Sequence, residues 1–490
     1  NLDCIIFSMR KTKIIATLGP STDDPLVLTK LLEEVDVVRI NLAHGTWDKK
    51  NPENHTDKIK TVQKIAKTIK KPIAILADLK GNKIRIGDLI QHTIDLEKDS
   101  MINVRFTEEK VSRTIDEIVV NANHVFEKIE NEAIILIDDG LIRLQIKEIN
   151  DETQTLTCTI EEGGLLSRRK GFEVADKVIT KSGLGEEDKE DLRKLAKLNV
   201  DWVALSFVNQ ASDVNQAREV LSSINSQMRV IAKIERLAAL KQLYWIIKAS
   251  DGVMVARGDL ALESGPGELT GLQKTIINQT VTGKKIVITA TQMMESMINN
   301  PTPTRAEMTD VSNAVLDGTD AVMLSAETAI GKYPIETVKA MAEVCEGAET
   351  YHQTIAKKEK FEFSEVQKID EAIAISSMSI AMHMNIKAII ALTESGATAL
   401  MMSRIRSDIP IYAFTRNEYT QRRVSLYRGV TSYPYKFTAN TFSEILPEVS
   451  KELLQSEMVR AGDLVLITSG SPLKVEGFTN SLRIIKINNQ

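Results

Sequence analysis

Short apolar, β-branched runs alternate with amphipathic stretches along most of the chain. Three such runs lie near the N-terminus and end in polar or glycine residues: Lys13–Gly19 (KIIATLG), Val35–Ala43 (VDVVRINLA) and Pro72–Leu79 (PIAILADL). The stretches between them carry apolar residues at helical spacing, as over Asp57–Ile69. Buried strands that alternate with helices predict a parallel sheet or barrel.

The same alternation resumes after Gly183 and supplies five further strands: Trp202–Phe207, Arg229–Ile234, Gly252–Ala256, Lys285–Thr291 and Ala321–Ser325. Eight parallel strand–helix units predict a closed (β/α)8 TIM barrel. Residues 87–182 interrupt it with short alternating strands, so we expect an inserted all-β domain. The glycines that flank this part, Gly81 and Gly183, would allow it to move as a lid.

The chain therefore divides into five predicted parts. They are a barrel domain over residues 9–86 and 183–350, an inserted β domain over 87–182, a charged linker over 351–368, a C-terminal α/β domain over 369–490, and residues 1–8. We interpret residues 1–8 as an upstream extension, because Met9 offers a more natural start.

Composition narrows the class of protein. A net charge of −5 without a long basic run argues against nucleic acid as the main partner. Cys4, Cys158 and Cys345 lie far apart, which fits a reducing cytoplasm and neither a zinc site nor a disulfide framework. No apolar run reaches membrane-spanning length, so no membrane partner is expected.

Candidate chemistry lies at the ends of the fifth and sixth barrel strands. Lys233 and Glu235 stand two residues apart, so in a strand both would point the same way, about 7 Å apart along the chain. Glu235 and Asp259 offer two carboxylates that suit Mg²⁺, and Lys233 offers a point charge for a phosphoryl group in transfer. Gly258 would let backbone N–H groups approach an anion closely. The alternative is a structural ion pair inside the barrel.

Longer motifs around these residues carry a family resemblance. They are ATLGPST (16–22), AKIE (232–235), VMVARGDLALE (253–263), ITATQMMESM (288–297) and the block from Asn300 to Pro334. Together they resemble pyruvate kinase, and the resemblance covers the chain from residue 10 onward. GELTGLQK (267–274) and TESG (393–396) make it more similar to the bacterial type II enzymes.

The resemblance implies phosphoryl transfer from phosphoenolpyruvate to ADP, which gives pyruvate and ATP, in a homotetramer with an effector domain. It implies that Glu235 and Asp259 bind Mg²⁺ or Mn²⁺, and that Lys233 and Arg39 face the phosphoryl group. The substrate carboxylate would lie against Gly258, Asp259 and Thr291, while Thr291 and Ser325 are candidates for protonating the enolate through water. Residues on the nucleotide side would be Arg85, His44, Asn41 and Pro20.

Several of these residues have plainer interpretations. His44 alone would be a surface histidine, although Arg39 and Asn41 beside it favour the nucleotide role. Ser325 precedes a helix, where serine is often only an N-cap. Arg305 would form a salt bridge at a subunit contact.

The monovalent-cation motifs depart from the family. The pattern N-F-S-H-G is Asn41-Leu42-Ala43-His44-Gly45 here, so the serine ligand is absent. The pattern D-T-K-G-P-E becomes DLKGNK, which places Lys83 where the glutamate stands. An ammonium at Lys83 would replace the charge of K⁺, so we expect K⁺-independent activity; otherwise Lys83 pairs with a neighbour and K⁺ still binds weakly. Glu187 stands where the family often has a nucleotide-side lysine, which puts that contact in doubt.

The loop Thr393–Thr398 is suited to cradle a phosphate with backbone N–H groups. Its candidate effector residues are Thr393, Ser395, Gly396 and Thr398. Ala397 occupies a position where members that favour fructose bisphosphate carry Lys or Arg. We therefore expect a monophosphate effector, a sugar monophosphate or AMP; the alternative is a vestigial site.

Two other functions compete with the kinase. A lyase of the phosphoenolpyruvate-binding type would share the carboxylate metal ligands but not the inserted domain. A non-catalytic protein on the same fold would be expected to lose Lys233, Glu235, Asp259 or Thr291, and all four are present.

Overall fold

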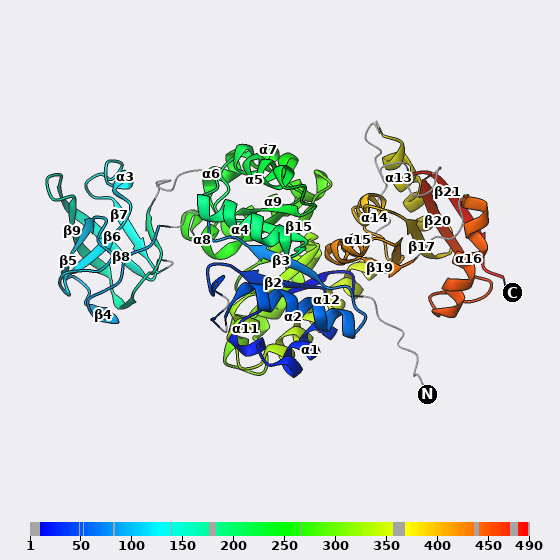
Figure 1. Cartoon of the computed structure of the whole chain (residues 1–490), viewed down its shortest axis with the longest axis horizontal. Coiled ribbons are helices and arrows are strands. Elements are labelled where there is room, and N and C mark those ends of the chain that lie inside the picture. The colour runs from blue at the N-terminus through cyan, green and yellow to red at the C-terminus, as the bar shows by residue number, and fades with distance from the viewer. Residues whose placement is uncertain are drawn as a thin grey trace.

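A computed structural model describes ten stretches of the chain: residues 10–48, 50–51, 53–81, 84–138, 140–175, 183–265, 267–355, 368–435, 441–470 and 479–488. Residues 1–8, Lys83 and residues 356–367 of the expected linker lie outside them. Figure 1 shows a central barrel with the inserted β domain at one end and the C-terminal domain at the other.

Eight parallel strands close the central barrel, which confirms the predicted fold class. The strands are β1 (Lys13–Thr17), β2 (Val37–Asn41), β3 (Ala74–Asp78), β12 (Trp202–Leu205), β13 (Arg229–Ile234), β14 (Gly252–Ala256), β15 (Ile286–Ala290) and β16 (Ala321–Leu324). Every residue of β1, β3, β14 and β15 is buried, because helices cover the outside and side chains fill the inside. Most strands are shorter than predicted, because the residues at their ends leave the ladder and enter the loops.

Helices surround the barrel: α1 (Pro25–Glu34), α2 (His55–Thr68), α4 (Glu186–Lys197), α5 (Ala211–Ser223), α6 (Leu237–Lys241), α7 (Leu243–Ala249), α8 (Arg257–Ser264), α9 (Leu269–Thr282), α10 (Arg305–Asp317), α11 (Ala326–Ala329) and α12 (Pro334–Ile355). Side chains fix some of their starts, as where Asp24 accepts the backbone N–H groups of Leu26 and Val27. Helix α12 continues to Ile355, so residues 351–355 of the expected linker are helical.

The inserted domain has its own apolar core and is built from β4 (Thr93–Leu96), β5 (Met101–Phe106), β6 (Glu117–Val120), β7 (Ile134–Ile137), β8 (Ile142–Asn150), β9 (Thr155–Glu162), β10 (Gly164–Ser167) and β11 (Phe172–Val174). Six strands form one sheet in the order β11-β7-β8-β9-β5-β6, and β10 pairs with β4. One helical turn, α3 (Asn123–Phe126), is the departure from the all-β prediction.

The C-terminal domain is a five-stranded sheet in the order β19-β18-β17-β20-β21. Its elements are α13 (Ile369–His383), β17 (Ile386–Leu392), α14 (Ala397–Ser403), β18 (Ile411–Thr415), α15 (Glu418–Arg423), β19 (Val430–Pro434), α16 (Phe442–Gln455), β20 (Leu464–Gly470) and β21 (Thr479–Lys486). The first four strands are parallel and β21 is antiparallel to β20, as a doubly wound α/β domain with one reversed edge requires.

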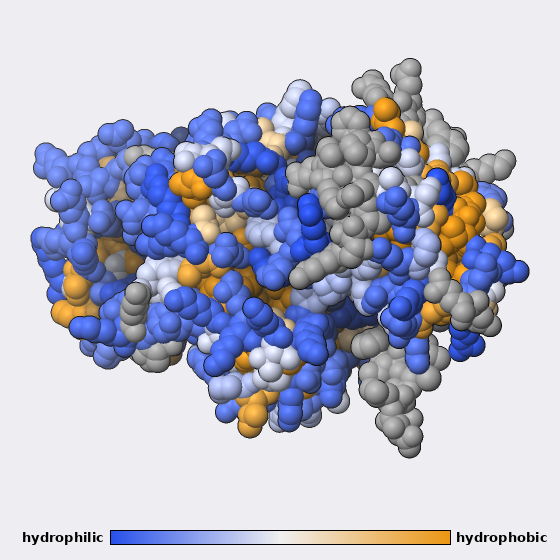
Figure 2. Space-filling view, turned by 45° about the vertical axis from the view of Figure 1, so that its right-hand side comes forward, coloured by the Kyte–Doolittle hydropathy of each residue, from blue (hydrophilic) through white to orange (hydrophobic). Residues whose placement is uncertain are grey.

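The surface is ordinary for a folded α/β protein. Hydrophilic residues cover most of the face shown in Figure 2. Among the helices that the structure describes, none combines the length and the apolar character that crossing a membrane requires.

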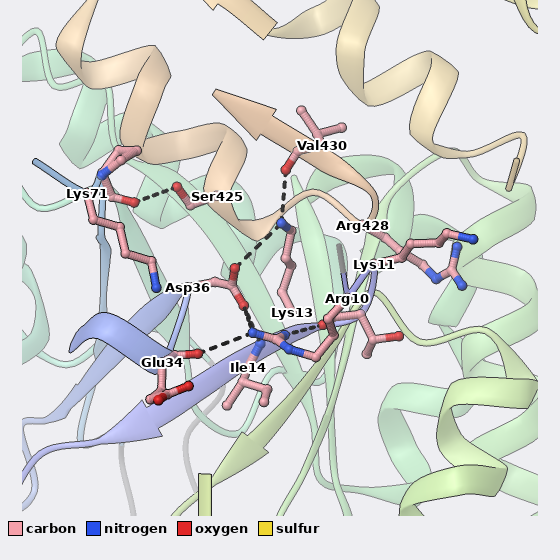
Figure 3. A network of polar contacts seen from close by, with 12 residues as sticks. Arg10, Lys11, Lys13, Ile14, Glu34, Asp36, Lys71, Ser425, Arg428 and Val430 are labelled. Atoms are coloured by element: carbon pink, nitrogen blue, oxygen red, sulfur yellow. Dashed lines mark hydrogen bonds and ion pairs between the residues drawn. The ribbon is translucent and has the colours of Figure 1, made fainter. Parts of the chain in front are cut away.

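The amino-terminal ends of the barrel strands pack against the C-terminal domain through buried charges (Figure 3). Lys13 Nζ donates to Val430 O at 2.9 Å and lies 3.5 Å from Asp36 Oδ1. Arg10 also pairs with Asp36, at 2.9 Å. Burial favours the neutral form of Asp36, but Arg10 and Lys13 outweigh it and lower its pKa to about 2. Asp36 is therefore a carboxylate that gathers two cations at the domain contact.

Two further aspartates at the starts of barrel strands receive arginines from the C-terminal domain. Arg404 forms a two-pronged pair with Asp320, and both side chains are almost fully buried. Arg422 Nε donates to Asp201 Oδ1 at 3.0 Å, and Asp201 Oδ2 accepts the Ile75 N–H at 2.9 Å. The two-pronged pair of Arg404 with Asp320, together with the burial of both side chains, fixes the orientation of the C-terminal domain on the barrel.

Asp201 generates a pH prediction. Burial raises the pKa of its carboxyl group from 3.8 to about 6, against the opposing effect of Arg422. Because the folded protein holds this proton to higher pH than the unfolded chain, the group stabilises the fold below pH about 4, and that contribution is lost as the pH rises through 6. Relative to Asp201→Asn, the free energy of unfolding of the wild type should fall by about 3 kcal/mol between these pH values. Urea unfolding of both proteins at several pH values measures this, and a constant difference would contradict it.

Candidate active site

The carboxyl-terminal ends of β2, β3 and β13 bring one carboxylate and two cations together in the barrel mouth. Asp78, at the end of β3, is only 1% exposed. It accepts a hydrogen bond from Arg39 Nε at 2.8 Å, and its other oxygen lies 3.3 Å from Lys233 Nζ. Arg39 also donates to Thr17 Oγ1 at 3.0 Å. A single buried carboxylate thus holds both cations on the same side of the barrel.

Lys233 connects this carboxylate to the next strands. Its Nζ lies 2.8 Å from Glu235 Oε1 and donates to Ser206 Oγ, also at 2.8 Å. Ser206 in turn donates to Leu79 O at 2.9 Å. The structure therefore brings Lys233 and Glu235 together on one face, as alternation along the strand predicts.

Mutual charge keeps the cluster ionised despite its burial. Burial opposes the ammonium of Lys233, but Asp78 and Glu235 outweigh it and raise its pKa. For Asp78, burial favours the neutral acid, but Lys233 and Arg39 outweigh it and lower its pKa. The site thus presents two fixed positive charges to any ligand in the barrel mouth.

The donor set at Glu235 fits a divalent cation. Its Oε2 accepts the Phe207 N–H at 2.5 Å, whereas Oε1 faces Lys233 but accepts no well-aligned hydrogen bond from the described residues. Burial raises the pKa of Glu235 against the effect of Lys233, and the negative charge of Asp259 raises it further. A divalent cation between the two carboxylates would relieve this repulsion. Among the described residues no group of three or more His, Cys, Asp or Glu side chains is arranged around a metal position, so substrate oxygens and water would complete the shell.

Thr291 follows β15 in an uncommon backbone conformation. Thr291 and Gln292 are consecutive non-glycine residues with left-handed φ values of 72° and 51°. In this turn the hydroxyl of Thr291 accepts the N–H of Gly258 at 2.9 Å and donates to Ala290 O at 2.6 Å. The turn places Thr291 beside the start of α8, where Gly258 and Asp259 lie.

Ser325 occupies the N-cap position of α11, but its side chain makes no capping hydrogen bond. Its backbone N–H donates instead to Glu327 Oε2 at 2.6 Å. The hydroxyl is therefore not used in the way that the plainer interpretation of this serine requires.

The residues predicted for the nucleotide side lie on several different segments. Asn41 ends β2, and its Oδ1 accepts the N–H of Ala43 at 3.1 Å. Burial lowers the pKa of His44, and the positive charges of Arg85 and Arg39 lower it further, which places these side chains near one another. Arg85 donates to Arg169 O of the inserted domain at 3.0 Å.

Two other sequence positions frame this region. Pro20 begins a short 3-10 turn, Pro20–Thr22, after β1. Glu187, which replaces the expected lysine, lies in α4 with its carboxylate 3.7 Å from Lys80 Nζ. Lys83 lies outside the described residues.

The predicted effector residues surround the start of α14. Gly396 has φ +83° and donates its N–H to Thr393 Oγ1 at 2.9 Å. The backbone carbonyl of Ser395 accepts from Arg423 at 3.3 Å. Thr398 is buried and its hydroxyl lies 2.6 Å from that of Thr479. Both threonine hydroxyls, the Gly396 N–H and the Ser395 carbonyl are thus engaged within the domain.

Two residues of this site, Asp78 and Ser206, are not among the predicted site residues. Asp78 is predicted only as part of the monovalent-cation pattern. Polar residues at or just after the ends of β3 and β12 were the available signal, because barrel sites are built from such positions.

Comparison with known proteins gives consistent matches over the whole chain. Residues 9–338 match the family described as pyruvate kinase, barrel domain, and residues 371–485 match pyruvate kinase, alpha/beta domain. A pyruvate kinase of Buchnera aphidicola (subsp. Baizongia pistaciae) is 42% identical over 488 residues, which cover 99% of this chain and 100% of that protein. Pyruvate kinase II of Salmonella typhimurium is 40% identical over 485 residues, with coverages of 98% and 99%. The crystal structure of a pyruvate kinase from Cryptosporidium parvum superimposes with a TM-score of 0.85 at 31% identity, over 98% of this chain and 96% of that one.

Proposed function

The chain belongs to the pyruvate kinase family, and on this premise we propose that it transfers the phosphoryl group of phosphoenolpyruvate to ADP, giving pyruvate and ATP. It is a phosphotransferase. The observation that carries the proposal in this chain is the pair of cations, Arg39 and Lys233, held by Asp78 at the mouth of the barrel.

Two fixed cations suit the charge that develops in this reaction. Phosphoryl transfer places negative charge on the equatorial oxygens of the transferring group. Arg39 and Lys233 would face that charge, and because Asp78 already holds both side chains, they need little reorganisation during transfer. Lys233 remains protonated, since its pKa is raised, and it therefore acts as a charge rather than as a base.

Glu235 and Asp259 would hold Mg²⁺ or Mn²⁺. When bound, the cation neutralises negative charge on the substrate oxygens. The negative charge of Asp259, which raises the pKa of the buried Glu235, supports this assignment because a divalent cation would offset that repulsion.

The substrate carboxylate would lie beside the start of α8. The backbone N–H groups of Gly258 and Asp259 and the Thr291 hydroxyl would donate hydrogen bonds to it, at the positive end of the helix. The Gly258 N–H and the Thr291 hydroxyl are hydrogen-bonded to each other in this structure, so they would exchange that hydrogen bond for bonds to the carboxylate. The Thr291 and Ser325 hydroxyls would pass a proton, through water, to the enolate that remains after transfer.

ADP would bind on the side of the barrel mouth formed by Arg85, His44, Asn41 and Pro20. The positive charge of Arg85 lowers the pKa of His44, and Arg85 donates to Arg169 O of the inserted domain; both contacts support this assignment. Glu187 cannot supply the positive charge that a lysine would bring, so this enzyme would rely on Arg85 for phosphate contacts.

We further propose a homotetramer in the cytoplasm. The tetramer rests on family resemblance, and the location rests on the use of cysteine. Cys158 and Cys345 are both buried and unbridged, which agrees with a reducing compartment.

Lys233→Met is the first test. Removing one transition-state charge should lower kcat by about 100- to 1,000-fold. The matched control is Lys64→Met, which changes an exposed lysine on α2 and should leave kcat within about twofold. Pyruvate formation from phosphoenolpyruvate and ADP with Mg²⁺ measures both. Full activity of Lys233→Met would refute the assigned role, and an inactive wild type would favour a non-catalytic protein.

The proposed K⁺ independence has its own test. In buffer free of Na⁺ and K⁺, the wild type should turn over at a rate within about twofold of that with K⁺, because Lys83 would supply the positive charge. Lys83→Glu restores the usual family residue and should make activity depend on added K⁺. Activity of the wild type only with K⁺ would keep the enzyme class and reject the role of Lys83.

The effector proposal predicts a choice between two ligand classes. A sugar monophosphate or AMP should activate at lower concentration than fructose bisphosphate, because Ala397 offers no cation for a second phosphate. Titration of the activity at subsaturating phosphoenolpyruvate compares them. Preferential activation by the bisphosphate would reject the proposal, and no response to either class would indicate a vestigial loop.

A further inference from the structure

Arg257, the first residue of α8, uses nearly all of its donors inside the protein and is only 6% exposed. Its Nε and one terminal nitrogen donate to Thr291 O at 3.2 and 2.6 Å. The same terminal nitrogen donates to Gln292 O at 3.1 Å. The other terminal nitrogen donates to Asp310 Oδ2 at 2.6 Å and to Gln273 Oε1 at 3.4 Å.

The two carbonyl groups that Arg257 binds belong to the left-handed pair described above. A non-glycine residue in that region is strained and persists only where its surroundings hold it. Thr291 and Gln292 follow each other in this conformation, with φ values of 72° and 51°. Charge-assisted hydrogen bonds to both carbonyls offset that strain at the place where it arises.

The backbone of α8 contacts the same threonine from another side. Gly258, the neighbour of Arg257, donates its N–H to the Thr291 hydroxyl at 2.9 Å. Two consecutive residues of α8 therefore contact the carbonyl and the hydroxyl of Thr291. This arrangement ties the strained turn after β15 to the helix start that carries Gly258 and Asp259.

We propose that Arg257 is a positioning residue for phosphoenolpyruvate binding, which holds the Thr291–Gln292 turn so that the Thr291 hydroxyl stays beside the Gly258 amide. Arg257 acts through Thr291, because all of its donors are directed to the protein itself. The inference rests on the proposed function, in which Thr291 and Gly258 receive the substrate carboxylate.

Geometry makes arginine hard to replace at this position. The planar guanidinium reaches two backbone carbonyls and Asp310 at once, whereas a lysine ammonium is a point donor on a flexible stem. Arg257→Lys keeps the positive charge beside Asp310 but cannot donate to both carbonyl groups at once. The variant therefore distinguishes an effect of the charge from an effect of the hydrogen-bond geometry.

Arg257→Lys should raise KM for phosphoenolpyruvate about tenfold and leave KM for ADP within about twofold. Steady-state kinetics with each substrate varied in turn measure this. A merely structural role would reduce the amount of folded enzyme and lower kcat without this split between the two KM values. An unchanged KM for phosphoenolpyruvate, or an equal rise in both KM values, would overturn the proposal.

Lys274→Met is the matched control. Lys274 of α9 pairs with Asp317 of α10, so it joins the two helices that carry Gln273 and Asp310. Its side chain is 52% exposed. This variant should keep both KM values and kcat within about twofold of the wild type. A rise in KM for phosphoenolpyruvate comparable to that of Arg257→Lys would assign the effect to helix packing and overturn the proposal.

A rescue experiment tests the turn itself. Gln292→Gly removes the conformational cost of left-handed φ at that residue. Added to Arg257→Lys, it should return part of the lost affinity, so the double variant should have a lower KM for phosphoenolpyruvate than the single one. A double variant with an equal or higher KM would show that the turn is not what Arg257 holds.

Calorimetric titration with phosphoenolpyruvate and Mg²⁺ separates the two proposals. If the wild type binds phosphoenolpyruvate but does not turn it over with ADP, the proposed function fails. The ratio of Kd between Arg257→Lys and the wild type then still decides the role of Arg257, with about a tenfold increase expected. A wild type that does not bind phosphoenolpyruvate overturns both.

Discussion

The site depends on the compensation of charge around Asp78. Two cations and a second carboxylate are buried in the barrel mouth, where an uncompensated charge would cost several kcal/mol. Asp78 forms ion pairs with both Arg39 and Lys233, and Lys233 also pairs with Glu235. Because Asp78 and Lys233 keep each other ionised and in place, the two cations are already arranged to face a highly charged ligand before it binds.

The local sequence pattern is sufficient to predict the barrel, but it does not predict which charged residues come into contact inside it. Each strand is an apolar run of ordinary length, and eight such runs with helices between them leave few alternatives to a closed barrel. The alternation that places Lys233 and Glu235 on one face is likewise local. The meeting of Asp78 with Lys233 joins positions 155 residues apart, and only closure of the barrel brings them together. Secondary-structure propensities do not indicate which distant residues meet, so they do not predict this contact.

Other features are not predicted by the sequence, because a tertiary contact overrides the local conformational preference. Thr291 is predicted as the last residue of a strand, yet it and Gln292 adopt left-handed φ, and Arg257 binds both carbonyl groups. The packing of the C-terminal domain on the barrel depends on Asp201 and Asp320, which read as ordinary residues before a strand. In both cases the partner is an arginine from a distant segment. The spacing of residues along the sequence does not show which groups such an arginine contacts.

Strand β1 contacts the C-terminal domain at one end and the charge cluster at the other. Lys13 donates to Val430 O at its first residue, and Thr17 accepts from Arg39 at its last. The strand has five residues, a length of about 17 Å, and is hydrogen-bonded along both sides within the closed barrel. The two ends of such a short, laterally bonded strand cannot move independently. Strand β1 therefore connects the domain contact at Lys13 with the Arg39 guanidinium by a direct path that contains no loop.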